Sequence, residues 1–166
     1  MKSLFIILTL LFSASSFAQL STLKLNGNYH QQCATDDDDN SFEQYLGFSN
    51  EHLEWKFVAF EDVNCQQPYL VFKREFTIIA TTDTEVQTAS IISSYVSLTD
   101  EITGALNIIN YCGFSDWQTN VMKDVTGKKC DDYQQLQQNE KQLFNYKIQD
   151  HQLIWNNNNL PFNKTL

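Results

Sequence analysis

Alternating apolar and polar positions, a pattern with a period of two residues, run through most of the chain from residue 23 onward. The clearest case is the segment 53–60, in which the polar side chains of Glu54 and Lys56 share one face. The opposite face holds only apolar side chains, which are those of Leu53, Trp55, Phe57 and Ala59. Because a strand with one buried face has this period, the segment is predicted to be a half-buried strand.

Several other segments are rich in the β-branched and aromatic residues that favour strands. They cover residues 23–33, 69–79, 85–98 and 106–111. Near the end of the sequence, segments 143–148 and 152–155 flank Gln149-Asp150-His151, so they are predicted to pair as a hairpin.

One helix is predicted, over residues 131–141, because Tyr133 and Leu136 approximate helical spacing and two aspartates stand at its start. The asparagine run 156–159 is predicted to be a loop, and Pro161 limits any strand after it.

About eight strands joined by short polar turns favour a closed antiparallel sheet, because closure removes exposed strand edges. The predicted fold class is therefore all-β, an antiparallel β-barrel of about eight strands with one short helix; a two-sheet sandwich is the alternative. No linker rich in Pro, Gly or Ser divides the 166 residues, so residues 19–166 are predicted to form a single domain.

The first 18 residues have the features of a secretory signal peptide. Lys2 precedes an apolar run, and Ser16 and Ala18 form the small-x-small pattern of a cleavage site. The run is shorter than the roughly 20 residues that span a bilayer, so no membrane span is predicted. Gln19 follows the cleavage site where a lipoprotein would need cysteine. We therefore expect a periplasmic or secreted protein.

The even number of cysteines agrees with export, because disulfides persist in oxidising compartments. Two bridges among four cysteines allow three connectivities, of which the simplest joins neighbours in sequence. In that pairing the bridges are Cys33–Cys65 and Cys112–Cys130. Zinc is the rival interpretation, but zinc sites use close cysteine pairs and none occurs here.

The chain is acidic, with 20 Asp and Glu against 11 Lys and Arg and a formal net charge of −9. Nucleic acids and anionic membrane surfaces require clustered Lys and Arg, so neither is an expected partner. The acidity suits a protein that captures a basic protein partner by electrostatic steering.

Catalytic patterns are incomplete in this sequence. The segments 47–51 and 113–117 approach the Gly-x-Ser-x-Gly turn of serine hydrolases, but each lacks the final glycine. The acidic run that begins at Asp36 has serine and glycine where a calcium loop needs glycine and glutamate. We therefore expect a protein that is not an enzyme and that has no cofactor and no metal site.

Aromatic residues recur across most predicted strands, and most of them are expected to fill the core. A subset that lines a cavity would form the apolar pocket typical of a small-molecule site. The predicted ligand-binding residues are Tyr29, Trp55 and Phe57, whose side chains are expected to point inward. Whether they fill the interior or line a cavity stays open at this point.

Gly27-Asn28-Tyr29 resembles the Gly-x-Trp that opens the first strand in the lipocalin superfamily, with Tyr29 in place of tryptophan. A closer similarity is to the small secreted lipocalin-like domain of the adenomatosis polyposis coli down-regulated type and to exported bacterial proteins like it. The motifs that resemble this domain are Gly27-x-Tyr29-x-x-x-Cys33, Phe60-x-Asp62-x-x-Cys65-x-x-Pro68, Cys112-Gly113-x-x-x-Trp117 and Gly127-x-x-Cys130.

The resemblance covers residues 23–155 and implies an antiparallel barrel stabilised by two disulfides. It carries over no catalytic residue, and it gives the Tyr29 position a structural role at the barrel floor. It also implies an apolar or amphipathic ligand, such as a lipid. The function expected from the sequence is therefore an exported lipocalin-like binder of a small ligand; the alternative is a protein-binding module such as an inhibitor or adaptor of a basic partner.

Overall fold

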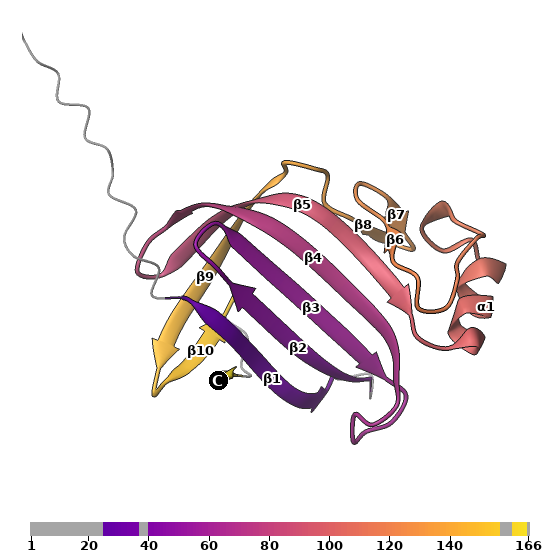
Figure 1. The fold of residues 1–166 in the computed structure, drawn as a ribbon, viewed down its shortest axis with the longest axis horizontal. Helices are drawn as coiled ribbons and strands as arrows, with labels where there is room; N and C mark the ends of the chain where they lie inside the picture. The colour runs from indigo at the N-terminus through magenta and orange to yellow at the C-terminus, as the bar shows by residue number, and fades with distance from the viewer. Residues whose placement is uncertain (1–24, 37–39, 157–160, 166) are drawn as a thin grey trace, which may run out of the picture.

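The computed structural model describes residues 25–36, 40–156 and 161–165 (Figure 1). The predicted signal peptide, residues 1–18, lies outside the described residues. The described elements, in chain order, are β1 (Gly27–Thr35), β2 (Ser41–Phe48), β3 (His52–Phe60), β4 (Pro68–Thr81), β5 (Glu85–Ser97), α1 (Asp100–Ile108), η1 (Tyr111–Gly113), β6 (Lys123–Asp124), β7 (Lys129–Cys130), β8 (Tyr133–Gln134), β9 (Lys141–Gln149), β10 (Gln152–Trp155) and β11 (Phe162–Thr165).

Eight of the described strands pair edge to edge in a closed antiparallel ring. The order around the ring is β1, β2, β3, β4, β5, β9, β10 and β11, and β11 pairs with β1 again. Ring neighbours are consecutive in the chain except at β5 and β9 and where β11 closes the ring on β1. Between these two strands the chain leaves the ring as the inserted segment, residues 98–140, which includes α1 (Figure 1). The predicted all-β class with about eight antiparallel strands is confirmed.

Strand β3 has the two faces that its sequence predicts. Leu53 is fully buried and Ala59 is 8% exposed on the inner face of the ring. On the outer face, the carboxylate of Glu54 lies 2.8 Å from the ammonium group of Lys73 on β4. The alternation therefore separates an apolar interior from a charged exterior.

The apolar core fills one end of the ring. Along β3 the core residue Leu53 comes first and Phe57 follows four residues later, outside the core cluster. On the antiparallel neighbour β4 the order is reversed, so that Phe76 lies in the core and Phe72 beyond it. The buried core side chains are those of Leu25, Tyr29, Leu46, Phe48, Leu53, Phe76, Ile78, Val86, Phe144, Tyr146, Leu153, Trp155 and Phe162.

The predicted hairpin near the C-terminus is confirmed as β9 and β10. Gln149 pairs with Gln152, and Asp150 and His151 form the two-residue connection between them. Both residues have positive φ, 51° and 66°, as the type I′ turn requires. This turn matches the right-handed twist of the paired strands, so it fixes their register.

The predicted position of the helix is wrong. Residues 131–141 form turns, the short strand β8 and the first residue of β9, whereas α1 occupies Asp100–Ile108. The Thr99 side chain caps α1 by accepting a hydrogen bond from the Ile102 backbone N–H, and two acidic residues in the first turn favour the positive end of the helix dipole. The strand predicted over 106–111 is also wrong, because this segment forms the end of α1 and the start of η1.

Two strands of the ring, β2 and β11, fall outside the predicted strand segments. In β2, the buried polar side chain of Gln44 interrupts an otherwise apolar inner face, so the alternation is weak. Strand β11 starts directly after Pro161, a position at which proline disturbs no ladder hydrogen bond. Both strands are held by pairing with β1.

Both predicted disulfides are present. Cys33–Cys65 joins β1 to the loop between β3 and β4, with 5.8 Å between the two Cα atoms. Cys112–Cys130 joins η1 to β7 within the inserted segment, with 4.1 Å between the Cα atoms. One bridge therefore fastens the ring and the other fastens the insertion.

Candidate functional site

A cleft of about 470 Å³ lies on the inner face of strands β2 to β5, beyond the core. This volume falls within the range of about 300–1,000 Å³ typical of small-molecule sites. The inserted segment supplies part of its wall. The lining residues are Phe42, Gln44, Trp55, Phe57, Ala59, Tyr69, Leu70, Phe72, Arg74, Tyr95, Tyr111, Tyr133 and Gln135.

Two of the three residues predicted to bind a ligand, Trp55 and Phe57, line this cleft. The third, Tyr29, is 4% exposed and belongs to the core cluster, where its ring meets Phe48 edge to face at 5.8 Å between centroids. Tyr29 therefore points inward but lies apart from the cleft.

Arg74 on β4 is the most unusual side chain of the cleft, because it is a cation that is only 7% exposed. Its guanidinium carbon lies 4.8 Å from the centroid of the Phe72 ring and 5.6 Å from that of Trp55, so the cation contacts two aromatic faces. One Nη atom donates a hydrogen bond to the Gln135 side-chain oxygen at 3.0 Å.

A chain of side-chain hydrogen bonds links Trp55 to two glutamines in the interior of the strand ring. The indole N–H of Trp55 donates to the side-chain oxygen of Gln44 at 2.9 Å, and the Gln44 amide nitrogen donates to the side-chain oxygen of Gln31 at 3.0 Å. Gln44 and Gln31 are both buried. Since each of these bonds fixes an amide orientation, the chain of hydrogen bonds holds the Trp55 ring in one position beside Arg74.

No protein-family model matches the sequence, and a search of curated proteins finds no match. Within the described residues, no group of three or more His, Cys, Asp or Glu side chains is placed to hold a metal ion. No helix in the described ranges combines the length and the apolar character that crossing a membrane requires.

The inserted segment packs against the cleft through a second apolar cluster. Its buried members are Leu106, Cys112, Trp117, Val125 and Cys130. Tyr95 of β5 joins this cluster and also lines the cleft, and its ring meets the Tyr111 ring edge to face at 5.6 Å. The cluster and its disulfide therefore position the part of the cleft wall that comes from the insertion.

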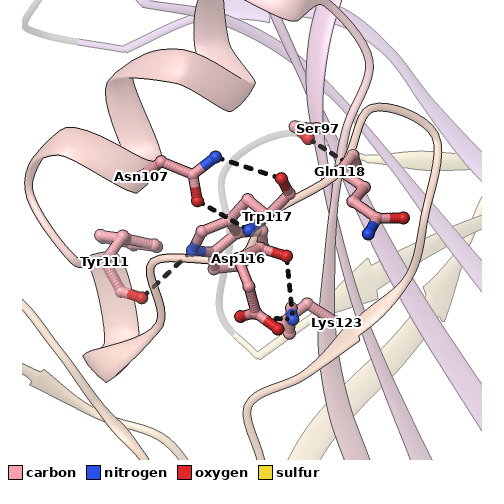
Figure 2. A network of polar contacts seen from close by, with 7 residues as sticks. All are labelled: Ser97, Asn107, Tyr111, Asp116, Trp117, Gln118 and Lys123. Carbon is pink, nitrogen blue, oxygen red and sulfur yellow. Dashed lines mark hydrogen bonds and ion pairs between the residues drawn. The ribbon is translucent and has the colours of Figure 1, made fainter.

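Asn107 of α1 forms two hydrogen bonds with the backbone of Trp117, elsewhere in the inserted segment (Figure 2). Its Oδ1 accepts a hydrogen bond from the Trp117 backbone N–H at 2.7 Å, and its Nδ2 donates to the Trp117 carbonyl at 3.1 Å. The Trp117 indole N–H donates in turn to the carbonyl of Tyr111 at 3.3 Å. Asn107 thereby links the helix to the segment that presents Tyr111 to the cleft.

Replacing Asn107 by alanine is expected to lower the free energy of unfolding by about 1–3 kcal/mol, because two backbone groups of the buried Trp117 lose their partners. Urea unfolding measures this difference. The exposed Gln118 is a neighbouring control, and its replacement by alanine should change stability by less than about 0.5 kcal/mol. Equal effects of the two variants would contradict the role given to Asn107.

Burial raises the pKa of the Tyr111 hydroxyl above its ordinary value of 10.0, and a hydrogen bond with Tyr95 and the charge of Asp131 act in the same direction. Above pH 10 the unfolded chain loses this proton while the folded protein keeps it. The folded state then binds more protons than the unfolded state, so stability falls as the pH rises above 10.

We expect the Tyr111→Phe variant to lose less stability than the wild type between pH 9 and about pH 11, since phenylalanine has no proton to retain. The variant has lower stability at pH 7 because its hydrogen bond with Tyr95 is gone. Chemical unfolding over this pH range tests the prediction, and identical pH dependence in the two proteins would refute it.

Proposed function

We propose that this protein is exported from the cytoplasm and binds a small apolar or amphipathic ligand in the aromatic cleft, as a non-catalytic, lipocalin-like binding protein. One observation carries the proposal: eight of the thirteen lining residues of the cleft are aromatic. Aromatic faces bind apolar molecules without demanding one geometry, and a few polar groups among them orient the ligand.

Export is supported by two independent features. Residues 1–18 have the sequence of a signal peptide, and the four cysteines form two disulfides. Disulfides of this kind persist in oxidising compartments such as the periplasm or the extracellular space. We therefore propose that the ligand is met outside the cytoplasm.

A binding role fits the lining residues better than a catalytic one. Besides its aromatic side chains, the cleft presents amide groups, small apolar groups and one guanidinium. None of the lining residues is a histidine, cysteine, serine or carboxylate, and these supply most nucleophiles and general bases. Apart from the tyrosine hydroxyls, the groups that are present are suited to orienting a molecule, which supports a binding role.

Filling the cleft tests the proposal. Ala59 lines the cleft, whereas the preceding residue, Val58, lies on the opposite face of the same strand. The Ala59→Phe variant should bind the neutral fluorophore N-phenyl-1-naphthylamine at least about tenfold more weakly than the wild type, while Val58→Phe should bind it as the wild type does. Fluorescence titration gives both affinities.

The added phenylalanine is expected to cost about 1–3 kcal/mol of stability at the cleft, so both variants are checked for cooperative unfolding before titration. Undiminished binding by the Ala59→Phe variant would show that the fluorophore binds elsewhere. Native mass spectrometry of the purified wild-type protein should also reveal a bound lipid-like molecule that solvent extraction removes.

A further inference from the structure

We propose that the ligand is an amphipathic carboxylate, whose head group binds Arg74 and whose apolar tail lies along the aromatic cleft. This inference rests on the proposed function and names the chemical class of the ligand. It starts from charge: Arg74 is the one charged side chain among the described residues that line the cleft. A cation at the floor of an aromatic cleft selects ligands by the charge of their polar end.

Among the described residues, no acidic side chain pairs with Arg74. Its Nε is buried without a hydrogen-bond partner among them. Gln135 accepts one of the five N–H donors of the guanidinium, and the aromatic rings contact its faces. A buried charge that is solvated this incompletely is costly, and an anionic ligand would remove much of that cost.

The position of Arg74 sets the orientation of the ligand. Arg74 is directly opposite Trp55 in the register of β3 and β4, next to the core, while Phe72 pairs with Phe57 and Leu70 with Ala59 farther along. The head group therefore lies at the inner end of the cleft. The tail runs outward over apolar side chains, which is the arrangement that buries most of an amphipathic molecule.

The chemistry of the guanidinium favours a carboxylate. Its planar fork matches the two oxygens of a carboxylate, and charge-assisted hydrogen bonds of this kind are about twice as strong as neutral ones. The acidity of the chain does not oppose binding at this position, because acidic groups of the neighbouring strands lie on the outer face. Glu54 and Glu75 both contact the Lys73 ammonium group there.

A head-group series on the wild-type protein tests the inference. Dodecanoate, dodecan-1-ol and dodecyltrimethylammonium each contain a linear chain of twelve carbons, counting the carboxylate carbon, and their head groups differ in charge. Competition with N-phenyl-1-naphthylamine, at concentrations below micelle formation, gives their relative affinities. We expect dodecanoate to bind at least about tenfold more tightly than the alcohol, and the ammonium compound to bind most weakly.

Substitutions test whether Arg74 causes the preference for dodecanoate. Arg74→Met keeps an unbranched, flexible side chain and removes the charge, so it should weaken dodecanoate binding by about tenfold or more and leave dodecan-1-ol binding within about threefold. Lys56→Met is the matched control, because it removes a cation that lies over the Tyr45 ring, 4.0 Å from its centroid, outside the cleft. This control should keep the wild-type preference.

The outcomes separate the two proposals. Equal affinities for all three compounds, or a preference for the alcohol or the ammonium compound, would overturn the carboxylate inference and leave the binding function standing. Failure of all three compounds and the fluorophore to bind would overturn both. Should Arg74→Met fail to fold, Arg74→Lys takes its place: it keeps the charge, loses the planar fork, and should show an intermediate preference for dodecanoate.

Discussion

Replacing Phe76 by alanine is expected to lower the free energy of unfolding by about 3–5 kcal/mol. The Phe76 side chain is fully buried at the centre of the core, opposite Leu53 in the register of β3 and β4. Its ring meets that of Phe144 edge to face, with 5.4 Å between centroids. The variant loses both the transfer free energy of the ring and the contacts that line the cavity it leaves.

Urea unfolding of the wild type and the variant measures the effect. The next residue on the strand, Thr77, is exposed on the outer face, so Thr77→Ala is the matched control and should change stability by less than about 1 kcal/mol. A loss below about 1 kcal/mol for Phe76→Ala would mean that the core collapses around the missing ring or that Phe76 is not packed as described.

Most strands of the ring can be predicted from the sequence, because each has one solvent-exposed face and one buried face. In β3 the charged side chains of Glu54 and Lys56 point outward, whereas Trp55 and Phe57 point inward. The sequence of this strand therefore shows a clear alternation of polar and apolar residues. The same reasoning explains why the sequence predicts no strand over β2: the side chain of Gln44 is buried on the inner face but is polar, as outer-face side chains are.

The strand prediction over residues 106–111 is wrong for a local reason. Ile108 and Ile109 are β-branched and stand in an apolar run, which favours a strand. The competing signal is the cap, Thr99 followed by Asp100 and Glu101, which is typical of a helix start. The cap satisfies a backbone donor of the first turn, and Leu106 packs in the apolar cluster of the insertion, so capping and packing both favour the helix.

The cleft could be predicted only in part. Trp55 and Phe57 lie on an apolar face that the sequence predicts. Arg74 alternates in phase with Phe72 and Phe76, but a cation at a buried position is not expected from an apolar face. The structure places it opposite Trp55 in the register of β3 and β4. Tyr111, Tyr133 and Gln135 reach the cleft through the folding of the inserted segment, which no short-range pattern encodes.

The two disulfides are expected to stabilise different parts of the protein. In the chain-entropy description, a bridge that spans 32 residues contributes about 4 kcal/mol and one that spans 18 contributes about 3 kcal/mol. Replacing Cys33 and Cys65 by serine removes the longer loop closure, which fastens the ring. Replacing Cys112 and Cys130 removes the closure that holds the insertion against the cleft.

We expect both double-serine variants to lose about 2–5 kcal/mol of stability, as measured by urea unfolding. Only the Cys112/Cys130 variant should also bind N-phenyl-1-naphthylamine more weakly under native conditions, because Tyr111 immediately precedes Cys112 and lines the cleft. Each variant serves as the control for the other. Equal loss of binding in the two variants would show that the cleft depends on the stability of the whole ring; unchanged binding in both would show that the insertion keeps its place without its bridge.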